Sequence, residues 1–274
     1  MNVQYYLKNL MLLHRNKEWL ASDISLREKL AFYPAIGASY VRLFAAHDKH
    51  VRYFGQRFYY DNPATPLNMQ IYPYEITHKI LRHMKKLPKY ALDIGGNIGQ
   101  FPLTLSAIVP DVKVDALEPN RDIFKILERN VAPYKNVRIH NAGVGKPSKT
   151  AKMFYEPSRS GVGSLMKENA GNTQNLKELP ITLVDDVSKV FGRKDYDLIT
   201  IDVEGYEKEV VANLKGVTCR YMFMEVSGQG RSKTYNHAGL FATIQKNFGD
   251  FDLVYCSGHS YTKATFDMLI EFKR

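Results

Sequence analysis

From residue 90 to the end of the chain, short β-prone runs alternate with stretches of helical pattern, and this rhythm limits the fold more than any other feature. Strands that alternate with helices form βαβ units, whose strands run parallel in one sheet. Strands are expected at residues 90–94, 112–118, 136–142, 196–202, 219–226, 251–256 and 264–272. The connection around Gly258 is too short for a crossover helix, so the last two strands should pair antiparallel. The sequence therefore predicts an α/β fold with a mainly parallel sheet and an antiparallel last strand.

The chain before this region has a different character. Helices are expected at residues 3–20, 24–33 and 74–87, and a hairpin at 51–60 that turns at Gly55 and Gln56. Residues 1–90 carry a net charge of +8, whereas residues 91–274 carry +2. A basic segment attracts nucleic acid, anionic lipid or a phosphorylated substrate, although a solvated face gives the same pattern. We expect an N-terminal helical and β-hairpin extension over residues 1–74 and a main domain over residues 75–274.

Nothing in the composition points to a membrane or to an oxidising compartment. No apolar stretch reaches the length that spans a bilayer, and the first residues lack the pattern of a secretory signal. Cys219 and Cys256 both lie in apolar, strand-like runs and are expected to be free thiols. These observations predict a cytoplasmic protein with no transmembrane segment.

The stretch ALDIGGNIGQF at residues 91–101 marks the place where a ligand is expected. Open α/β sheets bind ligands beyond the carboxyl ends of their strands, and the first strand ends here with Asp93 and a glycine-rich turn. Position 97 is Asn where the dinucleotide fingerprint requires Gly, and Asp93 would place negative charge beside a pyrophosphate. Glu118 ends the second strand, where a carboxylate accepts hydrogen bonds from ribose hydroxyls. The pattern favours a nucleoside ligand over a dinucleotide.

Asp93 suits a ligand with a cationic amino end, and Glu118 suits one with a ribose. S-adenosylmethionine (SAM), in which adenosine is joined to an amino acid, meets both requirements. The glycines would let such a ligand approach the backbone closely. The sequence therefore predicts SAM as the cofactor.

Four motifs together give the chain a family resemblance. They are DIGGNIG at 93–99, LEPN at 117–120, NAGVG at 141–145 and, most specifically, IDVEGYE at 201–207. The set resembles the FkbM-type family of SAM-dependent methyltransferases, over the chain from about Glu75 to about Glu225. Gly96 is a mild departure, since the family more often has Ala there. The resemblance implies a class I, Rossmann-like methyltransferase fold with a seven-stranded sheet, and usually O-methylation of a sugar, polyketide or similar hydroxyl.

The same resemblance assigns roles to residues at the strand ends. The cofactor turn would comprise Asp93, Gly95, Gly96, Asn97 and Gly99. Glu118 would hold the ribose, and Asn141 and Ala142 would lie near the adenine. Asp202 and Glu204 would lie beside the reacting methyl group. Asp202 would also contact the cofactor.

A hydroxyl acceptor also needs a base that removes its proton. The candidates are Asp202, Glu204, Glu225 and His259, and the sequence does not choose among them. No spacing of acids or histidines is typical of a dedicated metal site, so no metal is expected. The expected acceptor is a hydroxyl of a glycan or small molecule.

Two other functions compete with this interpretation. An RNA methyltransferase would use the net charge of +10, although the charge lies away from the motifs and no RNA-binding module is visible. A non-catalytic interaction subunit would not need the glycine turn and the ribose acid, and this chain has both. The sequence is compatible with a homo-oligomer and does not identify the acceptor.

Overall fold

The computed structural model describes residues 50–61, 65–148, 151–155, 163–167, 170, 176–227, 237–257 and 265–273. The helices expected at 3–20 and 24–33 lie outside the described residues, and so does His259. None of the helices in the described part of the chain is long and apolar enough to cross a membrane.

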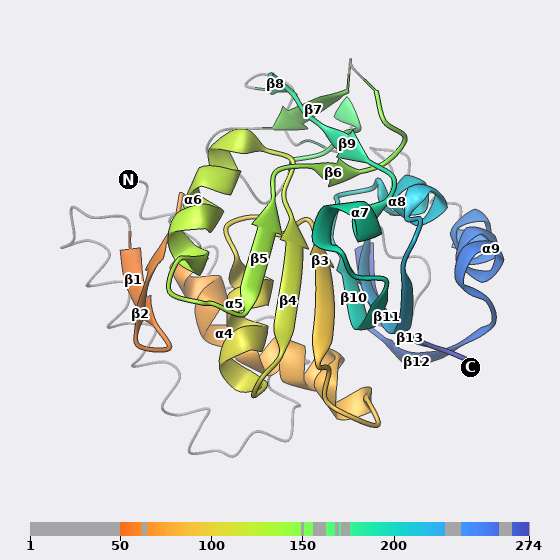
Figure 1. Ribbon diagram of the computed structural model, residues 1–274, viewed down its shortest axis with the longest axis horizontal. Coiled ribbons are helices and arrows are strands. Elements are labelled where there is room, and N and C mark those ends of the chain that lie inside the picture. Colours follow the sequence, from red (N-terminus) through yellow and green to blue (C-terminus); the bar gives the residue numbers. More distant parts are fainter. Residues whose placement is uncertain are drawn as a thin grey trace.

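One seven-stranded sheet organises the chain (Figure 1). Its strands are β3 (Tyr90–Ile94), β4 (Lys113–Leu117), β5 (Val137–His140), β10 (Asp195–Ile201), β11 (Thr218–Ser227), β12 (Phe251–Cys256) and β13 (Thr265–Phe272). They lie in the order β12-β13-β11-β10-β3-β4-β5. The neighbours from β5 to β11 run parallel, and β13 pairs antiparallel with both β11 and β12. The predicted fold class, including the antiparallel last strand, is confirmed.

Helices cover both faces of the sheet. On one face, α4 (Thr65–Lys79), α5 (Gln100–Ile108) and α6 (Arg121–Val131) share a core with the strands. On the other, α7 (Val187–Phe191), α8 (Glu207–Asn213) and α9 (His237–Phe248) share a second core. Strands buried on both faces read as continuous apolar runs, which is why the sequence located them to within one or two residues.

Two helix starts show how local signals set the element boundaries. Asn120 caps α6, where its Oδ1 accepts hydrogen bonds from the backbone N–H groups of Asp122 at 3.0 Å and Ile123 at 3.4 Å. Gly99 precedes α5 in the left-handed conformation, with φ of 97°. The chain thus leaves β3, turns at the glycines and enters α5 directly, which fixes the glycine turn at the carboxyl edge of the sheet.

Helix α4 differs from the prediction. It spans Thr65–Lys79 and is followed by a 3₁₀ turn at Leu81–His83, whereas a helix over 74–87 was expected. Pro66 stands in the first turn of α4, where the N–H that proline lacks would have no partner within the helix. Proline is common in loops, but here it begins a helix. Pro73 lies inside the helix. The earlier start brings residues 72 to 79 alongside the sheet edge where the first strand ends.

The hairpin of β1 (His50–Tyr53) and β2 (Gln56–Tyr59) forms as expected, but its turn is displaced by one residue. Phe54 and Gly55 occupy the turn with φ of 46° and 80°, because a two-residue hairpin of this twist needs positive φ at both positions. Asn130 of α6 ties the hairpin to the main domain. Its Oδ1 accepts from the Tyr59 N–H at 2.7 Å, and its Nδ2 donates to the carbonyls of Tyr59 and Ile98 at 2.8 and 2.7 Å. The division of the chain at residue 74 stays a prediction.

Small strands lie beyond β5. They are β6 (Gly143–Val144), β7 (Lys152–Tyr155), β8 (Lys177–Pro180) and β9 (Leu183–Val184). They pair as β6 with β9 and β7 with β8, outside the main sheet. Cys219 and Cys256 are free thiols, as predicted.

Candidate active site

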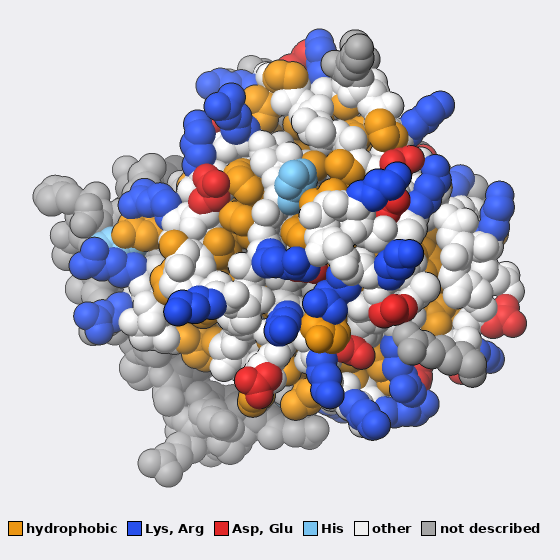
Figure 2. Space-filling view, viewed as in Figure 1, with side chains coloured by type: hydrophobic (Ala, Val, Ile, Leu, Met, Phe, Trp, Pro, Cys, Tyr) orange, Lys and Arg blue, Asp and Glu red, His pale blue; other side chains and the backbone are white. Residues whose placement is uncertain are grey.

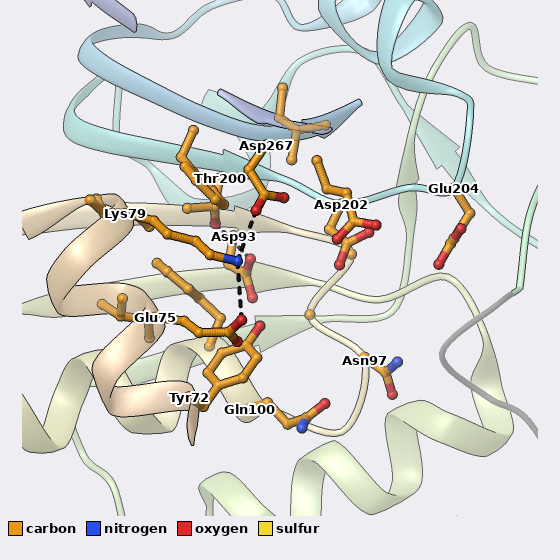
Figure 3. Close-up of a pocket in the computed structure, with 18 residues that line it drawn as sticks. Tyr72, Glu75, Lys79, Asp93, Asn97, Gln100, Thr200, Asp202, Glu204 and Asp267 are labelled. Atoms are coloured by element: carbon orange, nitrogen blue, oxygen red, sulfur yellow. Dashed lines mark hydrogen bonds and ion pairs between the residues drawn. The ribbon is translucent and has the colours of Figure 1, made fainter. Parts of the chain in front are cut away.

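A cavity of about 400 Å³ opens at the carboxyl edge of the sheet, where ligands bind in such folds (Figure 3). The glycine turn lies on one side, α4 on another, and the ends of β10, β11 and β13 close the third. Its lining residues carry unusually many carboxyl groups: Glu75, Asp93, Asp202, Glu204, Glu225 and Asp267. Lys79 is the one basic side chain among the described lining residues. The cavity therefore suits a cationic ligand.

The backbone N–H groups of the glycine turn are all in use within the protein. Each N–H from residue 95 to residue 99 donates to a protein oxygen at 2.7 to 3.0 Å: Gly95 and Gly96 to the Leu117 carbonyl, Asn97 to Glu118 Oε2, Ile98 to Asn97 Oδ1 and Gly99 to the Gly96 carbonyl. A phosphate cradle needs such groups free. The turn is therefore not a dinucleotide site, in agreement with the argument from Asn97.

The structure shows a reason for glycine at position 95 that the sequence did not reveal. Its φ is 96°, and a Cβ there would lie 1.9 Å from the backbone oxygen of Asp202. The Asp202 carbonyl, just after β10, thus lies directly beside Gly95, and the Asp202 N–H donates to the Ile94 carbonyl at 3.0 Å, which continues the parallel pairing of β10 with β3. Glycine is thus needed at position 95 for the chain's own backbone as well; Gly95 also lines the cavity, and its role in the cofactor turn stays a prediction. Gly99 does not line the cavity, and a Cβ there would meet Leu127 at 3.0 Å.

Asp93 is a buried cavity residue with one carboxylate oxygen that lacks a partner within the described part of the chain. Its side chain is 3% exposed, and its Oδ1 accepts a hydrogen bond from Thr200 Oγ1 at 2.7 Å. Oδ2 has no hydrogen-bond partner among the residues that the structure describes. Burial raises the pKa of Asp93 to about 7, although the Thr200 hydrogen bond lowers it. A cationic donor placed in the cavity would satisfy Oδ2 and favour the carboxylate.

Glu118 is buried beneath the turn and does not line the cavity. Its Oε2 accepts from the Asn97 N–H at 2.9 Å and its Oε1 from the Asn120 N–H at 2.7 Å. Burial raises its pKa to about 7, against the effect of these two hydrogen bonds. A carboxylate can accept about four hydrogen bonds, so two positions are left for ribose hydroxyls, and the ribose role stays a prediction.

The residues expected near the adenine are placed beside Glu118. Asn141 Nδ2 donates to the carbonyls of Glu118 at 2.8 Å and Pro119 at 3.2 Å, and Ala142 is fully buried. Neither residue lines the cavity. Their contact with a cofactor therefore stays a prediction.

The carboxyl groups at the ends of β10 and β11 repel one another. Burial, followed by the negative charges of Glu204, Glu207 and Asp93, raises the pKa of Asp202 well above its usual range. The charge of Asp202, followed by burial and the charge of Asp267, raises the pKa of Glu225 to about 8. Each of the two carboxyl groups is therefore harder to ionise than an exposed acid, and the charge of one opposes ionisation of the other.

Glu204 occupies a constrained turn. Its φ is 50°, in the left-handed region that a side chain rarely adopts. Ser164, which is fully buried, donates from Oγ to the Glu204 carbonyl at 2.7 Å. Ser164 thus ties the described segment at 163–167 to the IDVEGYE turn.

Six lining residues with polar side chains were not predicted as site residues from the sequence: Tyr72, Glu75, Lys79, Gln100, Thr200 and Asp267. The sequence spacing of Glu75 and Lys79 could have revealed their pairing, because residues i and i+4 share one face of a helix. No sequence pattern pointed to Asp267, since its position in the cavity depends on the strand register that sets it opposite Glu225 on β11. Among the described residues, no three acids, histidines or cysteines are arranged to hold a metal ion.

The seven-stranded, mainly parallel sheet agrees with the fold that the motifs implied. The family model "Methyltransferase FkbM domain" matches residues 93–250, more than half of the chain, and the chain belongs to this family. It is therefore a SAM-dependent methyltransferase, as the motifs indicated.

Individual relatives are distant. The chain is 26% identical over 176 residues to "Methyltransferase 1" of Beauveria bassiana, covering 57% of this chain and 71% of that protein. It is 25% identical over 158 residues to "Methyltransferase sdnD" of Sordaria araneosa, covering 47% of this chain and 60% of the relative. Among solved structures, Aeropyrum pernix fibrillarin with bound SAM has a TM-score of 0.44 and 13% identity, covering 82% of each chain. Likeness at this level says nothing of the acceptor.

Proposed function

We propose that this methyltransferase transfers a methyl group from SAM to a hydroxyl of a glycan or small-molecule acceptor. The observation that carries the proposal is the cavity, in which Asp93 Oδ2 is buried without a partner and carboxyl groups line the opposite wall. A general base for a hydroxyl proton is naturally a carboxylate or a histidine. The cavity offers several carboxylates beside the cofactor turn, which supports O-methylation.

The residues present fit SAM. Asp93 Oδ2 would accept a hydrogen bond from the ammonium of the methionine part, beside Gly95, Gly96 and Asn97. Glu118 would accept hydrogen bonds from the ribose hydroxyls, and Asn141 and Ala142 would border the adenine. When bound, SAM supplies a methyl group on a sulfonium sulfur. The positive charge of SAM would also relieve the repulsion among the cavity carboxyls.

The protein's own part in the reaction is to hold and orient the acceptor. Methyl transfer proceeds by in-line displacement, so alignment of the reacting atoms supplies much of the acceleration. Asp202 and Glu204, which follow β10, would border the reacting methyl group. A hydroxyl nucleophile also needs its proton taken by a carboxylate that is ionised at the working pH.

Methylation of RNA is the second candidate, and one surface feature favours it. Arg193 stacks on the Tyr90 ring at 3.5 Å, Lys113 lies 6.0 Å from the same ring, and Arg138 bonds Asp115 at 2.7 Å. Figure 2 shows basic side chains spread over the face of the molecule that is in view. However, these residues lie towards the amino ends of the strands, whereas the cavity lies at the carboxyl ends. The acidic cavity would also repel a phosphodiester backbone.

Titration calorimetry with SAM tests the proposal, using an Asp93→Ala variant and an Asp122→Ala control. Asp122 is an exposed acid on α6 outside the cavity. We expect micromolar binding by the wild type, a loss of about 100-fold in the Asp93 variant and no change in the control. Tritiated methyl transfer to neutral glycans and to RNA then separates the acceptors. A folded wild type that fails to bind SAM would refute the proposed function, and label transferred only to RNA, with binding lost steeply in salt, would favour the second candidate.

A further inference from the structure

Three neighbouring parallel strands begin with a lysine at the edge of the sheet that lies away from the cavity. Lys194 immediately precedes β10, Lys89 immediately precedes β3, and Lys113 is the first residue of β4. The strands lie in the order β10-β3-β4, and their amino ends are the lower ends in Figure 1. Neighbouring strands are about 5 Å apart, and the Lys113 N–H donates to the Lys89 carbonyl at 2.8 Å. A row of lysines therefore follows this edge.

An exposed leucine lies in the connection that leads into the row. Leu87 is 55% exposed, more than any other large apolar side chain in the described part of the chain. The connection is held on both sides of this residue. The Lys85 N–H donates to the Tyr221 hydroxyl at 3.2 Å, and the Lys89 N–H donates to Asp197 Oδ2 at 2.9 Å. A fixed backbone thus presents Leu87 to solvent between lysines.

The lysines of this edge are not neutralised by neighbouring acids. Four of them are exposed and make no ion pair with any described residue: Lys86, Lys89, Lys113 and Lys194. Glu271 is already paired with Lys85 at 2.9 Å and with Arg220 at 3.1 Å. Asp111 and Asp195 are exposed acids without an ion pair, so the unpaired lysines outnumber them by four to two. Like charges placed side by side raise the free energy of the folded chain, and an anionic partner would relieve this cost.

We propose that Lys86, Leu87, Lys89, Lys113 and Lys194, which we term the amino-edge surface, dock the protein onto a bilayer that contains anionic lipids. A lysine close to such a bilayer strengthens binding about fivefold through the negative surface potential. The leucine adds apolar area that can enter the boundary between headgroups and acyl chains. The docking is reversible, because one leucine and a few lysines bind far more weakly than a membrane-spanning helix.

The leucine also favours a lipid surface over a nucleic acid. Single-stranded nucleic acids are bound by aromatic rings that stack on bases, and an aliphatic side chain offers no such ring. Lysine is a point charge that suits diffuse attraction to many headgroups, whereas bidentate recognition of single phosphates is typical of arginine. The four unpaired cations of this surface are all lysines.

The docked protein would keep its cavity open to water. The amino-edge surface and the cavity lie at opposite ends of the same strands, and the five residues of β3 span about 16 Å. The surface therefore does not hold the methyl acceptor. The inference goes beyond the proposed function and does not depend on it, because it concerns where the protein acts and involves no cavity residue.

Vesicle flotation of the full chain tests the inference, with vesicles of phosphatidylcholine alone and of phosphatidylcholine mixed with phosphatidylserine. The wild type should bind the mixed vesicles only, and high salt should release it. The partition coefficient should fall about fivefold in Lys86→Gln and in Lys89→Gln and about 20-fold in the double variant. It should fall about fivefold in Leu87→Ser, since roughly half of this side chain is available for burial.

Two matched controls lie outside the amino-edge surface. Lys246→Gln removes an exposed lysine of α9 that makes no ion pair with the described residues, and Leu253→Ser removes a leucine of β12 that is 42% exposed. Neither control should change the partition coefficient. All variants should unfold at the urea concentration of the wild type, because the changed side chains are exposed.

Several outcomes would overturn the inference. They are equal binding to both kinds of vesicle, no binding to the mixed vesicles, and losses in the controls that match those in Lys89→Gln and Leu87→Ser. Binding of labelled single-stranded RNA in place of vesicles, weakened by Lys89→Gln but not by Leu87→Ser, would identify a nucleic acid as the occupant instead. A dimer that Leu87→Ser dissociates, without vesicle binding, would identify a second copy of the chain. The flotation assay contains no SAM, so failure of the proposed function would leave its result unchanged.

Discussion

Replacement of Asp93 by Asn should stabilise the protein without cofactor, and more so as the pH rises. Burial raises the pKa of Asp93 to about 7, against 3.8 for an unperturbed aspartate. Between these values the folded chain holds a proton that the unfolded chain has lost, so stability falls by about 1.4 kcal/mol per pH unit. From pH 5 to pH 8 the loss is about 3 kcal/mol. Asn keeps the acceptor oxygen for Thr200 and does not titrate, so the variant escapes this loss.

The assay is urea denaturation of wild type and Asp93→Asn at pH 5 and at pH 8. The difference in unfolding free energy should grow by about 3 kcal/mol in favour of the variant. Asp115→Asn is the control, because Asp115 is equally buried but bonds Arg138 and the Tyr196 hydroxyl at 2.7 to 2.8 Å. That variant should be less stable than wild type by about 2 kcal/mol at both pH values. A difference for Asp93→Asn that does not change with pH, or that favours wild type at pH 8, would refute the reasoning.

Two further predictions concern the turn and its cofactor. Gly95→Ala should lower the free energy of unfolding, measured in urea, by about 3 kcal/mol, because its Cβ would meet the Asp202 carbonyl at 1.9 Å. Gly192→Ala, with φ of 68° and nothing within 4 Å of the added Cβ, should cost about 1 kcal/mol. Equal losses in the two variants would contradict the close approach of the Asp202 carbonyl to Gly95. SAM binding at pH 6 should release about one proton from Asp93, measured as the dependence of the calorimetric enthalpy on buffer ionisation, and the release should disappear in Asp93→Asn. Proton uptake, or release that survives the substitution, would exclude Asp93 as the ammonium partner.

The sequence was sufficient wherever the controlling interactions are local. Buried strands such as Tyr90–Ile94 appear as short apolar runs, and the cap at Asn120 and the glycine before α5 appear as residue types at fixed positions. The short connection after β12 settles the antiparallel last pair because no crossover helix fits. The motifs also identified the family, since the same few residues must follow the same strands.

Local patterns predicted the structure less well at prolines and glycines, because these residues occur in more than one kind of structure. Pro66 reads as a loop residue but stands in the first turn of α4, and the hairpin turn lies at Phe54 and Gly55 because backbone twist, not composition, selects its position. Gly95 reads as space for a ligand. Only the path of β10 shows that the Asp202 carbonyl occupies that space.

The composition of the site was decided by tertiary structure. Asp267 is more than 170 residues from Asp93 in the chain, and only the antiparallel register of β13 on β11 places it beside Glu225. Lys79 contacts Asp267 only because α4 packs beside that end of β13. Sequence alone determined the fold and the cofactor, because apolar runs and the glycine turn act over a few neighbouring residues. The charge distribution of the cavity could emerge only in three dimensions, because burial and mutual repulsion depend on strands that meet after the sheet has formed.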